Sequence, residues 1–218
     1  MEWFQSTCMI LSFLFSLQLI NNNKVVTYMR YFYWYSTVAA AIVLVRWTSA
    51  HYTLPSKEIM TQLNSYSILF HFTFLSIFIS SIFPGKENLK FPLPLFCILF
   101  TTILFSLLTY PGKNINSGAF AIGNLCLIIY CIIYFYLLFQ NGSKVDLLKE
   151  PSFWIISGIF LGMSASIPIN SLHAYLKYET NIGLEHRKNL FSISLFAYGL
   201  FHLFLIKAYL CSIPRQTT

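Results

Sequence analysis

The sequence predicts an all-α fold: a polytopic membrane protein with seven transmembrane helices in one bundle. Of its 218 residues, 56% are hydrophobic and only 10% are charged, whereas soluble domains carry about a quarter charged residues. The mean hydropathy is +0.64. The charges lie in short clusters between apolar runs of about 20 residues, the length that a helix needs to cross a hydrocarbon core.

We expect residues 1–218 to form a single transmembrane domain. Its spans are predicted at about 3–20, 25–46, 63–83, 92–110, 119–139, 153–175 and 190–210. The first segment is the most polar of the seven, and a signal peptide is the alternative interpretation. Because Glu2 stands where a signal peptide would carry basic residues, we interpret this segment as a span.

Basic residues in the loops indicate the orientation. With seven spans, one side carries six lysines and arginines and the other carries eight. Since basic loops favour the cytoplasm, the chain is predicted in the cell membrane (inner or plasma) with an external N-terminus and a cytoplasmic C-terminus. RYFYWY at 30–35 then reads as an aromatic belt at the inner interface.

The net charge of +7 does not indicate a nucleic-acid partner. Its lysines and arginines are scattered through the loops, and no stretch is clustered enough to track phosphates. The five cysteines sit in or beside the spans and are interpreted as small apolar fillers. The histidines show no metal-ligand spacing, and His71 and His202 differ in predicted depth, which argues against haem. We expect no metal and no other cofactor.

The sixth predicted span, SFWIISGIFLGMSASIPINSLHAY at 152–175, contains residues that lipid does not favour. Gly158, Gly162 and Ser166 recur every four residues and predict a helix-packing face. Pro168 lacks a backbone donor and predicts a hinge. Asn170 and His173 are polar at membrane depth, and packing alone explains them less well.

Depth arithmetic at 1.5 Å per residue places His71 and Asn124 in the same external half as Asn170 and His173. Polar residues at membrane depth usually line a cavity or pair with one another. We therefore expect a ligand pocket that opens to the outside, with the candidate residues His71, Asn124, Ser166, Asn170 and His173. The alternative is polar packing, in which such residues contribute about 0.6 kcal/mol each.

Two other functions remain as alternatives to ligand binding. A small seven-helix transporter of the three-plus-one-plus-three design predicts that the first and last three spans resemble each other, which is not evident. An intramembrane serine protease of the rhomboid type would use Ser164 in GMSAS with His202 as its base. Ala165 replaces the glycine that follows the serine in that family. We expect no catalytic residues.

The stretch EPSFWIISGIFLG at 150–162 resembles an element of bacterial seven-helix membrane sensor modules. The residues that carry the likeness are Pro151, Phe153, Trp154, Ile155 and Gly158. Such modules often precede a histidine kinase or stand near one. The resemblance implies a non-enzymatic sensor or signalling/accessory subunit that binds an external ligand or partner. No kinase follows Thr218, so we expect it to signal through a separate protein, such as a signalling kinase or a larger complex.

Overall fold

The computed structural model describes residues 2–17, 27–51, 57–82, 98, 100–102, 104, 117–140, 146–178 and 184–212. Regular structure in these ranges is helical, which confirms the all-α prediction. The elements named here are α1 (Glu2–Leu17), α2 (Thr27–His51), α3 (Lys57–Ile82), α5 (Ser117–Gln140), the short 3-10 helix η2 (Leu147–Lys149), α6 (Pro151–Tyr178) and α7 (Leu184–Ser212).

Each long helix coincides with one of the predicted spans. Several helices continue past the apolar run into polar sequence, as α3 does at Lys57 and α6 does at Tyr178. A helix can do so because its backbone hydrogen bonds are internal and do not depend on apolar side chains. Apart from a few positions, the predicted span 92–110 lies outside the described residues.

Three of the described helices are long and apolar enough to cross a membrane. These segments are Ala121–Gln140, Pro151–Ile169 and Leu195–Ser212, with mean hydropathies of 2.2, 1.6 and 1.5. Two shorter apolar segments, Phe4–Leu17 and Phe70–Ile82, belong to α1 and α3. Length and composition of these helices favour a membrane location.

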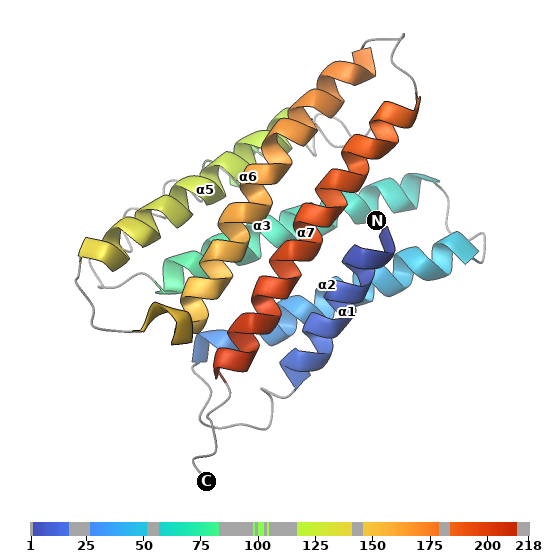
Figure 1. Cartoon of the computed structure of the whole chain (residues 1–218). Helices are drawn as coiled ribbons and strands as arrows, with labels where there is room; N and C mark the ends of the chain where they lie inside the picture. Colours follow the sequence, from blue (N-terminus) through green and yellow to red (C-terminus); the bar gives the residue numbers. More distant parts are fainter. Residues whose placement is uncertain are drawn as a thin grey trace.

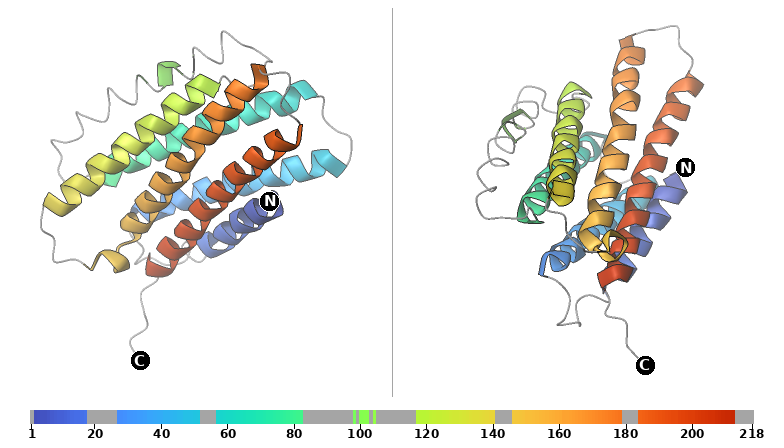
Figure 2. Two further views of the ribbon diagram at one scale, coloured as in Figure 1. Left: turned by 45° about the horizontal axis from the view of Figure 1, so that its top comes forward. Right: turned by 60° about the vertical axis from the view of Figure 1, so that its left-hand side comes forward.

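The six long helices pack in a closed ring. Going round it, each helix contacts the next in the order α1, α2, α3, α5, α6, α7, and α7 returns to α1. Figure 1 shows α5, α6 and α7 side by side with α2 and α3 behind them, and the two views in Figure 2 agree. The closed ring encloses one core and gives each helix an inner and an outer face.

Neighbouring helices run antiparallel at several seams. On α2 and α3, Tyr35 lies beside His71, while Tyr28, nearer the start of α2, contacts Phe78 further along α3. In contrast, α3 and α5 run in the same direction, because Phe72 lies at Gly123 and Ile82 shares a cavity wall with Leu138. α3 therefore ends and α5 begins at opposite ends of the ring.

The largest buried side chains of the core are aromatic, and the outer faces are apolar. Phe32, Phe72, Tyr130, Phe201 and Tyr209 are fully buried. On α5, large apolar side chains at alternating spacings of three and four residues are exposed: Ile122, Leu125, Ile129, Ile132, Tyr136 and Phe139. Polar side chains lie inside the ring instead, namely Ser12, Ser16, Ser36, Ser76, Asn124, Ser152, Ser166 and His202. The apolar outer face distinguishes this bundle from a soluble one, whose helices carry polar residues on their outer faces.

Candidate functional site

Asn124 of α5 and Ser166 of α6 form a buried hydrogen bond between neighbouring helices. Nδ2 of Asn124 donates to Oγ of Ser166 across 2.8 Å, and both side chains are fully buried. Oγ of Ser166 in turn donates to the backbone carbonyl of Met163 across 2.9 Å. Because a hydroxyl has one proton, Ser166 gives that proton to Met163 and acts as an acceptor toward Asn124.

This pairing fixes the orientation of the Asn124 amide. The NH₂ group must face Ser166, so the carbonyl oxygen Oδ1 faces the other way. Within the described part of the chain, this Oδ1 is buried and accepts no hydrogen bond. A buried polar atom in that state costs about 1–3 kcal/mol. Asn124 thus presents an acceptor that the described fold does not use.

Tyr35 of α2 and His71 of α3 form a second hydrogen bond between helices. The Tyr35 hydroxyl lies 2.6 Å from Nδ1 of His71. The other ring nitrogen, Nε2, is buried and has no hydrogen-bond partner among the described residues. In a neutral imidazole one nitrogen carries the proton and the other accepts. When the Tyr35 hydroxyl donates to Nδ1, Nε2–H of His71 becomes an unused donor.

His202 of α7 pairs with Ser12 of α1. Nδ1 of His202 lies 3.0 Å from Oγ of Ser12, and the same Oγ donates to the Met9 carbonyl across 2.9 Å. The single hydroxyl proton is used by the carbonyl, so Nδ1 of His202 must be the donor. A general base would have to accept a proton from its nucleophile. Among the described hydrogen bonds none joins His202 to Ser164.

These pairs belong to one connected cluster. Tyr198 of α7 interacts through its hydroxyl with Ser166, and its ring lies edge-on to that of His71 with centroids 6.0 Å apart. The rings of Tyr35 and His202 are nearly parallel, with centroids 6.4 Å apart. Every long helix of the ring contributes a member to this cluster, which we call the polar centre: Ser12, Tyr35, His71, Asn124, Ser166, Tyr198 and His202.

Three of the predicted ligand-binding residues lie in the polar centre: His71, Asn124 and Ser166. The other two, Asn170 and His173, lie on α6 about one and two turns beyond Ser166. Their side chains are outside the described residues. The structure therefore brings α3, α5 and α6 together at the predicted site, and the outer part of the predicted pocket stays a prediction.

The predicted packing face of α6 meets α7. A Cβ atom added at Gly158 would lie 2.7 Å from Cβ of Phe204, closer than real Cβ atoms approach. At Gly162 the nearest atom would be Cβ of Phe201 at 3.5 Å, which is ordinary contact. Glycine is therefore required at position 158 for the close approach of the two helices, whereas position 162 has room for a methyl group.

Pro168, the predicted hinge, lies inside α6, which continues to Tyr178. Proline has no N–H, so the backbone carbonyl of Ser164 loses its helical hydrogen bond. That carbonyl lies two residues before Ser166. The helix is thus weakened immediately beside the polar centre.

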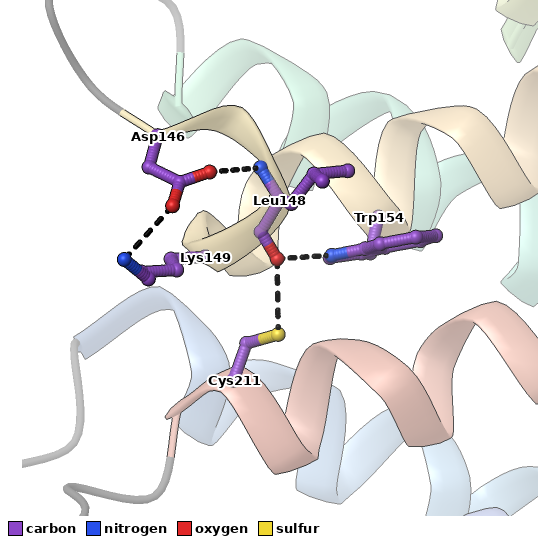
Figure 3. Close-up of polar contacts among 5 residues, drawn as sticks. All are labelled: Asp146, Leu148, Lys149, Trp154 and Cys211. Carbon is purple, nitrogen blue, oxygen red and sulfur yellow. Dashed lines mark hydrogen bonds and ion pairs between the residues drawn. The ribbon is translucent and has the colours of Figure 1, made fainter.

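The residues that carry the sensor-module resemblance anchor the start of α6. Pro151 occupies the first helical position, where a missing N–H leaves no bond unmade. Nε1 of Trp154 donates to the Leu148 carbonyl across 2.9 Å, and Sγ of Cys211 contacts the same carbonyl at 3.5 Å (Figure 3). The ammonium group of Lys207 lies 5.6 Å from the centre of the Trp154 ring. These contacts tie α6 to η2 and to the end of α7.

Four members of the polar centre were not predicted as ligand-binding residues: Ser12, Tyr35, Tyr198 and His202. Tyr35 was assigned to an interfacial aromatic belt. A signal for its burial was present, since Met29, Phe32, Ser36 and Ala39 are spaced by three and four residues and are all buried. That spacing marks one helical face, and Tyr35 lies on it.

Comparisons of the chain with protein-family models, curated proteins and solved structures give no match. The chemistry of the polar centre is therefore the main guide to function. Its groups are neutral hydroxyls, imidazoles and one amide, which exchange hydrogen bonds readily with a polar, uncharged ligand. Among the described residues, no three His, Cys, Asp or Glu side chains converge.

Proposed function

We propose that the chain is a non-enzymatic membrane sensor or signalling subunit that binds an external ligand or partner at the polar centre. The observation that carries this proposal is that Oδ1 of Asn124 and Nε2 of His71 are buried without a hydrogen-bond partner among the described residues. One is an acceptor, and the other is a donor when the Tyr35 hydroxyl donates to the ring. A ligand with a hydroxyl or amide group offers the complement of both.

Embedding in a membrane is supported by the outer faces of the helices. The exposed face of α5 between Ile122 and Phe139 is entirely apolar, and Phe139 is 66% exposed. In water such a stripe would be an aggregation site, whereas lipid is an apolar solvent for it. Leu203 and Leu210 continue the pattern on α7.

Seven spans are supported by the helix directions. The parallel pair α3 and α5 needs a returning segment between them, and the predicted span 92–110 supplies one. Of the other seams, α2–α3, α5–α6 and α6–α7 are antiparallel. In contrast, α1 and α7 run in the same direction, because Phe4 and Ser12 of α1 lie beside Phe196 and His202 of α7, respectively. A chain of seven spans predicts this pattern, since its odd-numbered spans cross the bilayer in one direction and its even-numbered spans in the other. With the eight-to-six bias of basic residues, seven spans favour an external N-terminus and a cytoplasmic C-terminus.

A ligand at the polar centre would change the seam between α3 and α5. A Cβ atom at Gly123 would lie 2.9 Å from Cζ of the Phe72 ring, so the two helices are already in close contact. A ligand group that hydrogen-bonds to both Asn124 and His71 needs space between α3 and α5. Its binding therefore favours an arrangement in which these two helices lie further apart. Binding that distinguishes two arrangements shifts the equilibrium between them, and α6, weakened at Pro168, is the element that we expect to move.

The resemblance of residues 150–162 to sensor modules supports a role in signalling. The change at the polar centre would be passed to a separate partner, such as a signalling kinase or a larger complex. The connected side chains of the polar centre reach α7, whose last turns contact η2 and the start of α6. In the proposed orientation, that end faces the cytoplasm.

The test uses the purified full chain and a panel of sugars, polyols, amino acids and short amides, with thermal unfolding as the readout. A compound that stabilises the wild type should lose its effect in Asn124→Leu and in Tyr35→Phe/His71→Phe. Gly162→Ala, which lies outside the polar centre, is the matched control. A stabilising effect that persists in both variants would contradict the proposal. Net flux of that compound into vesicles containing the chain alone would instead indicate the transporter alternative.

A further inference from the structure

A second site lies at the other end of the bundle, where α6 begins. A cavity of about 350 Å³ is bounded there by α2, α3, α5 and the start of α6, and its wall includes Tyr28, Ile82, Tyr134, Leu138, Glu150 and Ser152. Tyr134 lies ten residues beyond Asn124 on α5, which is about 15 Å at 1.5 Å per residue. The volume falls in the range of about 300–1,000 Å³ that small-molecule sites occupy.

Two tyrosines from different helices interact with the same serine at this cavity. The Tyr134 hydroxyl of α5 donates to Oγ of Ser152 across 2.9 Å. The Tyr28 hydroxyl of α2 interacts with the same serine. The Tyr28 ring is also held by an edge-on contact with Phe78, with centroids 5.9 Å apart. The wall therefore contains two fixed aromatic rings, together with the alkyl groups of Ile82 and Leu138.

Glu150 gives the cavity a negative charge. It is the ionised group among the described wall residues, and its charge acts on both Tyr28 and Tyr134. Two lysines on elements that border this region have other partners: Lys149 pairs with Asp146 at 2.8 Å, and Lys207 lies over Trp154 (Figure 3 shows the first pair). Among the described residues, no lysine or arginine forms an ion pair with Glu150.

We propose that this cavity binds a small organic ammonium ion. The Glu150 carboxylate balances its charge, and the tyrosine rings attract it through cation–π interactions. Ile82 and Leu138 contact its alkyl groups. A bare metal cation fits this wall less well, because Mg²⁺ and Ca²⁺ require six or more oxygen ligands. The inference does not depend on the polar centre, so either proposal can fail without the other.

Choline is the probe, measured by calorimetric titration of the full chain in dodecyl maltoside at pH 7. Its uncharged isostere 3,3-dimethyl-1-butanol tests whether the charge matters. We expect choline to bind and the isostere to bind at least about tenfold more weakly. Glu150→Gln should weaken choline binding by at least about tenfold, and Tyr134→Leu by several-fold. Asp146→Asn removes a carboxylate from the same connector outside the cavity, so its affinity should stay at the wild-type value.

Two further measurements complete the test. Thermal unfolding of each variant shows that it is folded. Competition with dihexanoylphosphatidylcholine identifies the source of the ammonium group: tighter binding of this lipid supports a headgroup in the cavity, whereas tighter binding of free choline supports a soluble amine. The proposal is overturned if choline shows no binding at about 10 mM, if the isostere binds equally well, or if Asp146→Asn weakens binding as much as Glu150→Gln does.

Discussion

Asn124 donates a hydrogen bond to Ser166, but the hydroxyl proton of Ser166 has an acceptor of its own and does not depend on Asn124. The bond between Nδ2 and Oγ is 2.8 Å long, and the serine proton goes to the Met163 carbonyl. The dependence is therefore one-sided. Removing Asn124 leaves the serine proton satisfied, whereas removing the Ser166 hydroxyl leaves the whole buried amide without a described partner.

This asymmetry predicts opposite effects for two substitutions. Asn124→Leu should leave the free energy of unfolding unchanged or raise it by up to about 2 kcal/mol, because it removes an unused buried acceptor. Ser166→Ala should lower it by about 1–3 kcal/mol. Chemical or thermal unfolding in detergent measures both. If Asn124→Leu is clearly destabilising, the asparagine serves packing and the ligand-binding interpretation loses its main support.

A double-mutant cycle tests the pair formed by Tyr35 and His71. Tyr35→Phe leaves Nδ1 of His71 without its 2.6 Å partner, and His71→Phe leaves the Tyr35 hydroxyl without its hydrogen-bond partner on α3. Each single variant should lose about 1–3 kcal/mol of stability. The double variant should lose less than the sum of the two, since neither polar group remains. Additive losses would mean that the bond contributes nothing to the fold.

The two glycines of α6 form a matched pair. Gly158→Ala should destabilise the bundle by about 1–3 kcal/mol, because its new Cβ would meet Cβ of Phe204 beside the backbone of α7. Gly162→Ala has room at 3.5 Å and should be neutral or stabilising by up to about 1 kcal/mol through its higher helix propensity. Unfolding midpoints of the two variants check this. Equal effects would show that the α6–α7 approach is not set at position 158.

The ion pair beside η2 gives a pH prediction. A hydrogen bond from Lys149 holds the pKa of Asp146 below its ordinary value of 3.8. A lowered pKa means that the stabilising contribution is present above the unfolded-state pKa and is lost as the pH falls through the folded-state value. Since both side chains are largely exposed, the effect is local and small.

Hydrogen exchange at the Leu148 amide, which donates to Asp146 Oδ1 at 3.3 Å, reports on this pair. Comparing the wild type with Asp146→Ala at each pH removes the intrinsic pH dependence of exchange. The wild type should be more protected between pH 5 and 8, and the difference should vanish well below pH 3.8. A difference that persists in strong acid would mean that another contact protects the amide.

The helices were predictable from the sequence because their signal is local. Apolar runs such as 119–139 are long, and α5 follows that run closely at Ser117–Gln140. Gly158 was also assigned to a packing face from its spacing alone. These features depend on residues three or four positions apart, which a single sequence displays directly.

The partners across the ring were not predictable in the same way. Ser12 and His202 are 190 positions apart in the chain, and no spacing rule relates them. Tyr35 lies in an aromatic run where hydropathy does not separate the inward face from the interfacial belt. The direction in which each helix turns its polar groups is set by packing against its neighbours, so the connected polar centre emerged only from the structure.

We propose that α6 borders a polar, externally accessible site in a membrane bundle. Labelling of introduced cysteines in intact cells tests it most directly. With the five native cysteines replaced, single cysteines are placed at Asn170, at Lys144 and at Asn181, and a membrane-impermeant thiol reagent is added. We expect positions 170 and 181 to react from outside and position 144 to react only after lysis. Protection of position 170 while 181 reacts, or reaction of position 144 in intact cells, would contradict it.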